Sequence, residues 1–180
     1  MISLRSRITQ VLLEYFILHE GTEMYVNDIA RRFNLESGNL TRKLRELEKD
    51  GILKSRWQGA QRYYSLNTFF PLLKEYKKII TRTIGLEHKL RSALRDLSGI
   101  KEAFIFGSYA GDRMDPLSDI DVMVIGDHDT IELNKRIAGL QRSIDRPVNV
   151  ISLTVEEYRK KKGKDLFFKS VQKKEKIVLL

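Results

Sequence analysis

Two short apolar runs in the second half of the chain, with polar residues at fixed places, constrain its fold most. Residues 104–108 (Phe-Ile-Phe-Gly-Ser) predict a buried strand that ends in a turn into a helix. Residues 120–125 predict a second strand, with Asp119 just before it and Asp121 inside it. Because side chains alternate between the two faces of a strand, we expect both carboxylates to point the same way.

A bound cation would relieve the repulsion between these two acids, which is costly on an otherwise apolar strand. Mg²⁺ favours one or two carboxylates together with substrate phosphates. Gly107 lets the backbone approach a phosphate, while Ser108 and the following helix N-terminus supply donors. We therefore expect Asp119 and Asp121 to hold Mg²⁺, and Gly107 and Ser108 to bind a nucleotide triphosphate. A plain turn beside a solvated edge strand fits the flanking Ile, Val and Met residues less well.

These residues also carry a resemblance to a known family. The Gly-Ser pair at 107–108 and the Ser-Asp-Ile-Asp sequence at 118–121 resemble the signature of the nucleotidyltransferase superfamily that includes DNA polymerase β. The length and flanks resemble its small, minimal members, over residues 86–180. The resemblance implies an α/β domain that binds Mg²⁺ and a nucleoside triphosphate.

The resemblance also assigns a third catalytic position, which complete members of the superfamily fill with an acid on a later strand. The corresponding strand here is 147–151, and its polar residue is Asn149. An amide oxygen can contact a metal, but it cannot accept a proton as a carboxylate does. With Asp119, Asp121 and Asn149 in the catalytic positions, we expect nucleotide binding rather than turnover.

Other acids are candidates for the missing carboxylate. Asp145 lies just before the Arg-Pro pair that precedes this strand, and Asp112 and Asp115 lie between the two halves of the motif. The family commonly has Arg-Gly where this chain has Gly111 and Asp112. An acid there would weaken nucleotide binding unless it also holds metal.

The first 68 residues predict three helices and a hairpin. Apolar spacing indicates helices over 3–18, from an Asn27 cap to Phe33, and over 37–49. Two β-rich segments, 52–57 and 61–66, flank a glycine-containing loop and predict a hairpin.

This pattern resembles a winged helix-turn-helix over residues 3–68, in which the second helix of the motif enters the DNA major groove. The resemblance implies DNA contacts from the third helix and from the wing, by side chains that read base edges or bind phosphates. These residues are Ser37, Asn39, Thr41, Arg42, Lys43, Arg45, Lys54, Arg56 and Arg62. The alternative is that the cations balance Glu46, Glu48 and Asp50 on a solvated helix.

A long apolar stripe from Pro71 to Leu97 predicts a connecting helix, which Gly85 bends or divides. The stripe packs on the second domain or meets its counterpart in a homodimer, and the two interpretations are compatible. Operator palindromy usually mirrors a protein two-fold axis, so a dimer fits a regulator.

After the acids, the sequence predicts a helix near 131–144, a strand at 147–153, a capping-box helix from Thr154, a last helix and a short terminal strand. The basic run at 159–162 fits the helix dipole better than an acceptor-binding patch.

Composition limits the class of protein. The 180 residues include no cysteine, which excludes disulfides and thiolate metal sites, and their net charge of +9 favours a polyanionic partner. No apolar run approaches the ~20 residues that cross a bilayer, and the start lacks a signal-peptide core, so we expect a cytoplasmic protein.

Together these patterns predict an α+β and α/β chain with three parts: a winged helix-turn-helix at 1–68, a connecting helix at 69–97 and a nucleotidyltransferase-like domain at 98–180. We expect a transcriptional regulator that binds double-stranded DNA and Mg²⁺-nucleoside triphosphate. One alternative is an active, antitoxin-like nucleotidyltransferase that modifies a protein partner or a small molecule. The other is a non-enzymatic interaction module.

Overall fold

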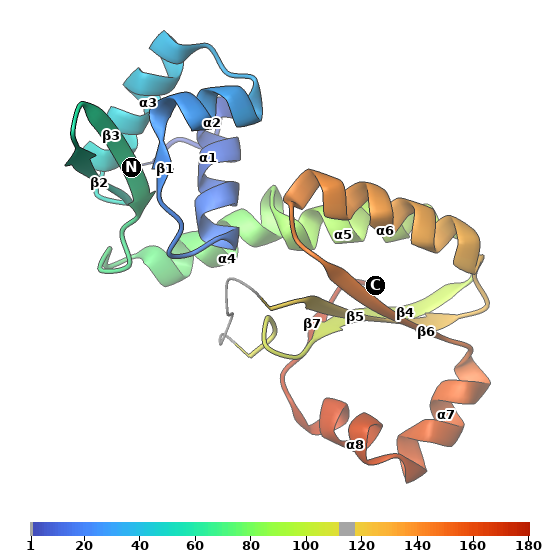
Figure 1. The fold of residues 1–180 in the computed structure, drawn as a ribbon. Helices are drawn as coiled ribbons and strands as arrows, with labels where there is room; N and C mark the ends of the chain where they lie inside the picture. The colour runs from blue at the N-terminus through green and yellow to red at the C-terminus, as the bar shows by residue number, and fades with distance from the viewer. Residues whose placement is uncertain (1, 112–117) are drawn as a thin grey trace. The chain divides into compact units, whose positions relative to one another are not determined.

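The chain folds as two units, Met1–Gly85 and Leu86–Leu180, in a computed structural model that describes residues 2–111 and 118–180 (Figure 1). The first unit contains α1 (Arg7–Leu18), β1 (Met24–Tyr25), α2 (Val26–Phe33), α3 (Ser37–Lys49), β2 (Leu53–Gln58), β3 (Gln61–Leu66) and α4 (Leu73–Thr83). Its strands form an antiparallel sheet in the order β1-β3-β2. The three helices and the hairpin that the sequence predicts are present, and β1 adds a third strand.

Two helix starts in this unit differ from the sequence prediction. Helix α1 begins at Arg7 rather than at residue 3, because the Ser6 hydroxyl accepts from the Thr9 N–H and caps it. The prediction that Asn27 caps α2 is wrong. The cap is Tyr25, which makes no side-chain cap bond, since the chain passes directly from β1 into the helix.

The core of the first unit lies between α1, α3, α4 and the sheet. Leu40, Leu44 and Leu47 repeat on one face of α3 and are buried together with Tyr64 of β3. Ile80 of α4 belongs to the same cluster. The apolar stripe predicted for residues 69–97 is therefore divided between two helices, of which α4 packs in the first unit and α5 (Leu86–Arg95) begins the second.

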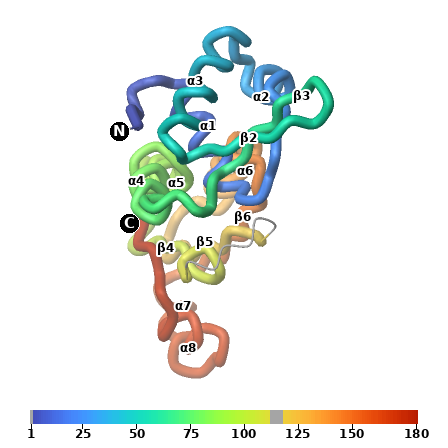
Figure 2. Tube along the Cα trace, turned by 90° about the vertical axis from the view of Figure 1, so that its left-hand side faces the viewer, coloured from blue at the N-terminus to red at the C-terminus, as the bar shows by residue number. Residues whose placement is uncertain are grey.

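The second unit contains a four-stranded sheet in the order β6-β5-β4-β7. After α5 its elements are β4 (Ile100–Phe106), β5 (Ile120–Gly126), α6 (Thr130–Ile144), β6 (Val148–Leu153), α7 (Val155–Lys164), α8 (Leu166–Lys173) and β7 (Ile177–Val178). Strands β5 and β6 are parallel, and the other pairs are antiparallel. Helices α5 and α6 cover one face of the sheet, whereas α7 and α8 lie on the other (Figures 1 and 2).

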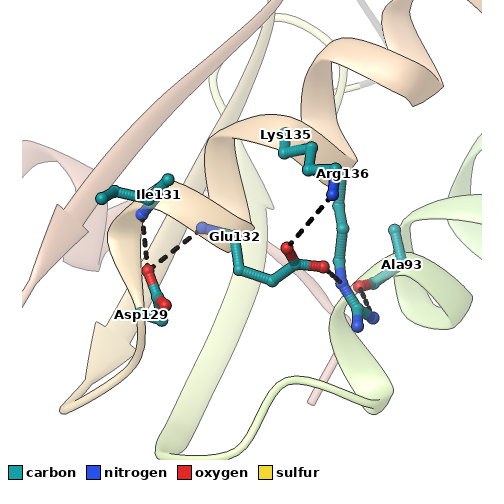
Figure 3. A network of polar contacts seen from close by, with 6 residues as sticks. All are labelled: Ala93, Asp129, Ile131, Glu132, Lys135 and Arg136. Atoms are coloured by element: carbon teal, nitrogen blue, oxygen red, sulfur yellow. Dashed lines mark hydrogen bonds and ion pairs between the residues drawn. The ribbon is translucent and has the colours of Figure 1, made fainter.

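The second unit is held on both faces by specific contacts. On one face, Asp129 caps α6 by accepting from Ile131 N and Glu132 N at 2.8 and 3.1 Å. Arg136 bonds Glu132 at 2.9 Å and the Ala93 carbonyl at 3.2 Å, and thereby joins α6 to α5 (Figure 3). On the other face, apolar side chains of α8 pack against the sheet. The capping box that the sequence predicts at the start of α7 is present.

No helix in the described part of the chain is long and apolar enough to cross a membrane.

Candidate nucleotide site and nucleic-acid interface

The two halves of the Gly-Ser and Asp-x-Asp motif meet where β4 ends and β5 begins. Strand pairing sets Phe106 opposite Asp121, and Asp121 opposite Asn149 of β6. The three residues therefore occupy one row across the sheet. By the alternation of the strand, Asp121 shares its face with Met123, which packs in the cluster with α8.

Gly107 lies directly against Asp121. Its φ is +79°, a left-handed conformation that side chains with a Cβ rarely adopt. A Cβ added to it would lie 2.6 Å from Asp121 Oδ2. The backbone conformation therefore favours glycine, and an added Cβ would displace the Asp121 carboxylate.

Ser108 links the two motif halves, because its Oγ lies 3.0 Å from Ser118 Oγ. The Ser118 carbonyl in turn accepts from the guanidinium of Arg146, a side chain with only 4% of its surface exposed. The Ile120 N–H donates to the Pro147 carbonyl at 3.1 Å. The backbone on both sides of Asp119 is therefore held by the segment that leads into β6. Sequence reasoning assigned no role to Arg146, and no local pattern signals one.

The acids differ in their surroundings. Asp121 is half-buried, and its Oδ1 accepts from Asn149 Nδ2 at 3.1 Å, whereas Asp119 is exposed just before β5. Within residues 2–111 and 118–180, no three acidic or histidine side chains gather as a metal site. Two carboxylates suit Mg²⁺ when nucleotide phosphates complete its ligands, so the side chains present fit such an ion.

The alternative acids are placed differently. Asp145 ends α6 as its C-cap, exposed and in a left-handed conformation with φ of +53°. Its neighbour Arg146 donates to the Ser118 carbonyl of the motif. Asp112 and Asp115 lie outside the described residues.

The predicted DNA-contacting residues of α3 fall into two groups. Ser37, Asn39, Arg42 and Arg45 are exposed, with Arg42 Nη2 donating to Asn39 Oδ1 at 3.4 Å, whereas Thr41 and Lys43 are half-buried. Lys43 forms an ion pair with Glu46. The Lys43 ammonium, as a hydrogen-bond donor to Glu46, is the first cause of a lowered pKa of that carboxyl.

Two wing arginines have carboxylate partners. Arg56 Nε donates to Glu23 Oε2 at 2.7 Å, and this bond lowers the pKa of Glu23. Arg62 donates to Glu48 at 2.6 Å and to Ser55 Oγ at 3.0 Å, and its guanidinium lies 5.5 Å from the Trp57 ring centre.

Three predicted cations remain available to a polyanion. Arg42, Arg45 and Lys54 are exposed and form no ion pair within the described part of the chain. They belong to α3 and the first wing strand, the elements that the resemblance assigns to DNA.

Comparisons with known proteins agree with both halves of this description. The family model described as "Nucleotidyltransferase domain" matches residues 87–179, more than half of the chain. The chain belongs to the nucleotidyltransferase domain family. A model described as "Helix-turn-helix domain" matches residues 3–56. The predicted fold, a winged helix-turn-helix followed by a nucleotidyltransferase-like α/β domain, is thus confirmed.

Solved structures with some likeness include proteins of both kinds. HlyU from Vibrio cholerae is 19% identical over 44% of this chain and 82% of that chain, with a TM-score of 0.37. A toxin–antitoxin crystal structure with AMP-PNP is 22% identical over 52% of this chain and 72% of that chain, with a TM-score of 0.38. Likenesses of this size say nothing about the role of this chain. Among curated proteins, none matches its sequence significantly.

Proposed function

We propose that the protein is a transcriptional regulator that binds duplex DNA through its first unit and a Mg²⁺-nucleoside triphosphate through its second. The observation that carries the proposal is the contact of the Asn149 amide with Asp121. An amide donates at this position and cannot accept a proton, so the site is suited to hold a nucleotide rather than to transfer part of it.

The DNA contacts are assigned to α3 and the wing. Arg42 and Arg45 lie on the exposed face of α3, where they can reach base edges or phosphates, and Lys54 suits a phosphate. Lys43, Arg56 and Arg62 already bind carboxylates, so their DNA contacts require these ion pairs to open.

The nucleotide contacts are assigned to the motif. Gly107 and Ser108 would cradle the phosphates, and Asp119 and Asp121 would hold Mg²⁺ between them and the triphosphate. When bound, the cation neutralises phosphate charge and relieves repulsion between the acids. The protein itself supplies the position of both acids, through the bonds of Ser118 and Ile120.

We place the protein in the cytoplasm, where both ligands occur, and assign it a homodimeric state. Leu72 and Ile79 remain exposed on and beside α4, 53% and 47% respectively, while the adjacent Leu73 and Ile80 are buried. Sedimentation at several concentrations would detect the dimer, and Ile79→Asp should shift it toward monomer.

Incubation with each labelled nucleoside triphosphate and Mg²⁺, with and without cell lysate, tests the proposal. We expect saturable nucleotide binding without label transfer. In a separate selection from genomic DNA, we expect the protein to enrich a duplex sequence. Brisk transfer of label to a protein would contradict the proposal. It would support the second candidate, an active nucleotidyltransferase with a protein acceptor, which the family membership itself favours.

A further inference from the structure

Positive charge in the second unit is concentrated in α7, α8 and the segment that follows them. Residues 155–176 contain nine basic and four acidic side chains, a net charge of 9 − 4 = +5. The other residues of the unit contain nine basic and eleven acidic side chains, a net charge of 9 − 11 = −2. The basic residues therefore form a local feature and do not reflect the composition of the whole domain.

Most of these cations have no carboxylate partner in the described residues, and three of them lie over aromatic rings. Lys176 Nζ lies 4.8 Å from the Phe104 ring centre. Among the nine, only Lys160 forms an ion pair with a carboxylate in the described residues, with Glu156 at 2.7 Å. Lys161 Nζ lies 5.6 Å from the Phe168 ring centre, and Lys162 Nζ lies 5.9 Å from that of Tyr158. Both lysines are exposed, so their charges remain accessible to a partner. Helix α7 has no buried residue.

Two exposed apolar side chains lie within this basic region, at the start of α8. Leu166 is 82% exposed and Phe167 is 45% exposed. Lys169 and Lys173 follow Leu166 at helical spacing, so the three side chains share one face, opposite the buried Phe168. We call the exposed Lys161, Lys162, Leu166, Phe167, Lys169 and Lys173 the α7–α8 surface.

The α7–α8 surface adjoins the candidate nucleotide site. The Phe167 ring packs edge-on against the Phe106 ring, with centres 5.9 Å apart. Phe106 is the residue before Gly107, and it is paired with Asp121 across the strands. A molecule bound at Leu166 and Phe167 would thus lie next to the strand ends that carry the motif.

We propose that the α7–α8 surface binds an acidic protein segment that carries an apolar side chain. An apolar centre with a charged rim is the usual anatomy of a protein–protein contact. Nucleic acid fits less well, because Leu166 cannot stack on a base and the Phe167 ring already packs against Phe106 and Phe168. The first unit has fifteen basic and nine acidic residues, a net charge of 15 − 9 = +6, so it does not complement the surface. The inference goes beyond the proposed function, since it requires neither DNA nor nucleotide.

Fluorescence anisotropy with the full-length protein tests this inference directly. The probes are a labelled Glu/Asp-rich peptide with a central Leu, the same peptide with Ser in place of Leu, and an oligothymidylate of equal charge. We expect the Leu peptide to bind about tenfold more tightly than the Ser peptide. Leu166→Ser should abolish that difference, and Lys169→Glu with Lys173→Glu should weaken both peptides by about tenfold or more. The charge-matched control, Lys101→Glu with Lys135→Glu elsewhere in the unit, should change neither.

Three outcomes would overturn the inference. They are equal binding of the Leu and Ser peptides, tighter binding of the oligothymidylate than of the Leu peptide, and a control variant that weakens binding as much as the α7–α8 variant. Melting temperatures establish that each variant is folded. Stabilisation by Mg²⁺ and nucleotide is measured on the same samples, so loss of that response identifies a failure of the nucleotide site without affecting the peptide result.

Discussion

At the residue scale, the Asn149 amide and the Asp121 carboxylate determine what the site can do. The amide donates to Asp121 Oδ1 at 3.1 Å, and it adds no charge to the two carboxylates nearby. An acid at position 149 would instead place another negative charge against Asp121 in the metal-free site. Because position 149 holds an amide where complete family members have an acid, the site also lacks the proton acceptor on which transfer chemistry depends.

Replacing Asn149 by aspartate should reverse both effects. Asn149→Asp should lower the melting temperature of the metal-free protein, because a second carboxylate then faces Asp121, and Mg²⁺ should restore it. Where transfer chemistry is present at all, the added base should raise its rate on the order of 10²–10⁴-fold, most clearly with Mn²⁺. Calorimetry in EDTA and in Mg²⁺ measures the first effect. A variant equally stable in both would show that Asn149 does not face a metal site.

Gly107 allows an equally local test. Gly107→Ala should reduce the free energy of unfolding by about 1–2 kcal/mol, because alanine is strained at a φ of +79°. It should also weaken nucleotide binding, since the Cβ would displace Asp121 Oδ2. The matched control is Gly163→Ala in α7, where an added Cβ meets nothing within 4 Å. The control should be neutral or slightly stabilising in urea denaturation; similar losses in both variants would contradict the special role of Gly107.

At the element scale, α3 and the wing combine side chains that stabilise the unit with side chains that face outward. Glu48 of α3 joins the wing through Arg62 and Ser55, at 2.6 Å from each. Arg42 lies on the exposed side of the same helix, where it donates a hydrogen bond to the Asn39 side chain. We therefore expect Arg42 to affect DNA affinity and Arg62 to affect the stability of the unit.

Alanine substitution separates these two roles. Arg42→Ala should cost about 1–3 kcal/mol in binding to the preferred duplex, with no change in stability. Arg62→Ala should instead reduce the free energy of unfolding by about 1–2 kcal/mol, because Glu48 loses a charged hydrogen-bond donor. Duplex titration and urea denaturation of both variants measure the two quantities. An Arg42 variant with unchanged DNA affinity would argue against α3 as the recognition helix.

The start of α3 makes stability depend on pH. Backbone N–H groups of Asn39 and then Gly38 donate to the Glu36 carboxylate and lower its pKa in the folded protein. A lowered folded pKa stabilises the protein above the ordinary carboxyl pKa, and this contribution is lost as pH falls through the folded value. Denaturation from neutral pH to about pH 3 should show a smaller acid-induced loss for Glu36→Gln than for wild type. If the free energy of unfolding depended on pH identically in both proteins, the Glu36 cap would not be a source of the pH dependence. Glu23, Glu46 and Glu157, whose pKa values are also lowered, contribute equally to both proteins.

The sequence predicts elements with strong periodicity and misses those made by distant contacts. Helix α3 has the predicted bounds because Leu40, Leu44 and Leu47 repeat on one face and Gly51 follows. Strand β1 was not predicted, because two residues show no alternation and its pairing with β3 is a tertiary contact. For the same reason, Tyr25 rather than Asn27 caps α2.

Prediction of the candidate site follows the same rule. The positions of Gly107 and Asp121 follow from local motifs, and that of Asn149 follows from the family resemblance. In the structure Asp121 contacts both of these residues. The contact that holds the motif in place, from Arg146, does not follow from any local pattern. Arg146 contacts Ser118 across 28 positions of sequence, and only the parallel pairing of β5 with β6 brings them together.

At the scale of the whole molecule, two units with different chemistry share one chain. The first unit carries the exposed cations Arg42, Arg45 and Lys54 on α3 and the wing. The second holds Asp121 against Gly107, with Asp119 just before the same strand. If the second unit binds a Mg²⁺-nucleotide, its response to that ligand must depend on the acids and not on the charge of the chain in general. Stabilisation by nucleotide and Mg²⁺ should therefore disappear when the Asp119 and Asp121 carboxylates are removed.

Thermal melting of the wild type and of Asp119→Ala with Asp121→Ala, in nucleoside triphosphate with Mg²⁺ or EDTA, tests this claim most directly. The wild type should gain stability only with both ligands, by about 2.7 kcal/mol at a nucleotide concentration of ~100 times Kd. The double variant should gain none, and without metal it should be at least as stable as wild type because like charges are gone. Asp96→Ala with Asp127→Ala, two exposed acids of the same unit, is the control and should respond like wild type. Equal stabilisation of the wild type and the Asp119/Asp121 variant would contradict the account.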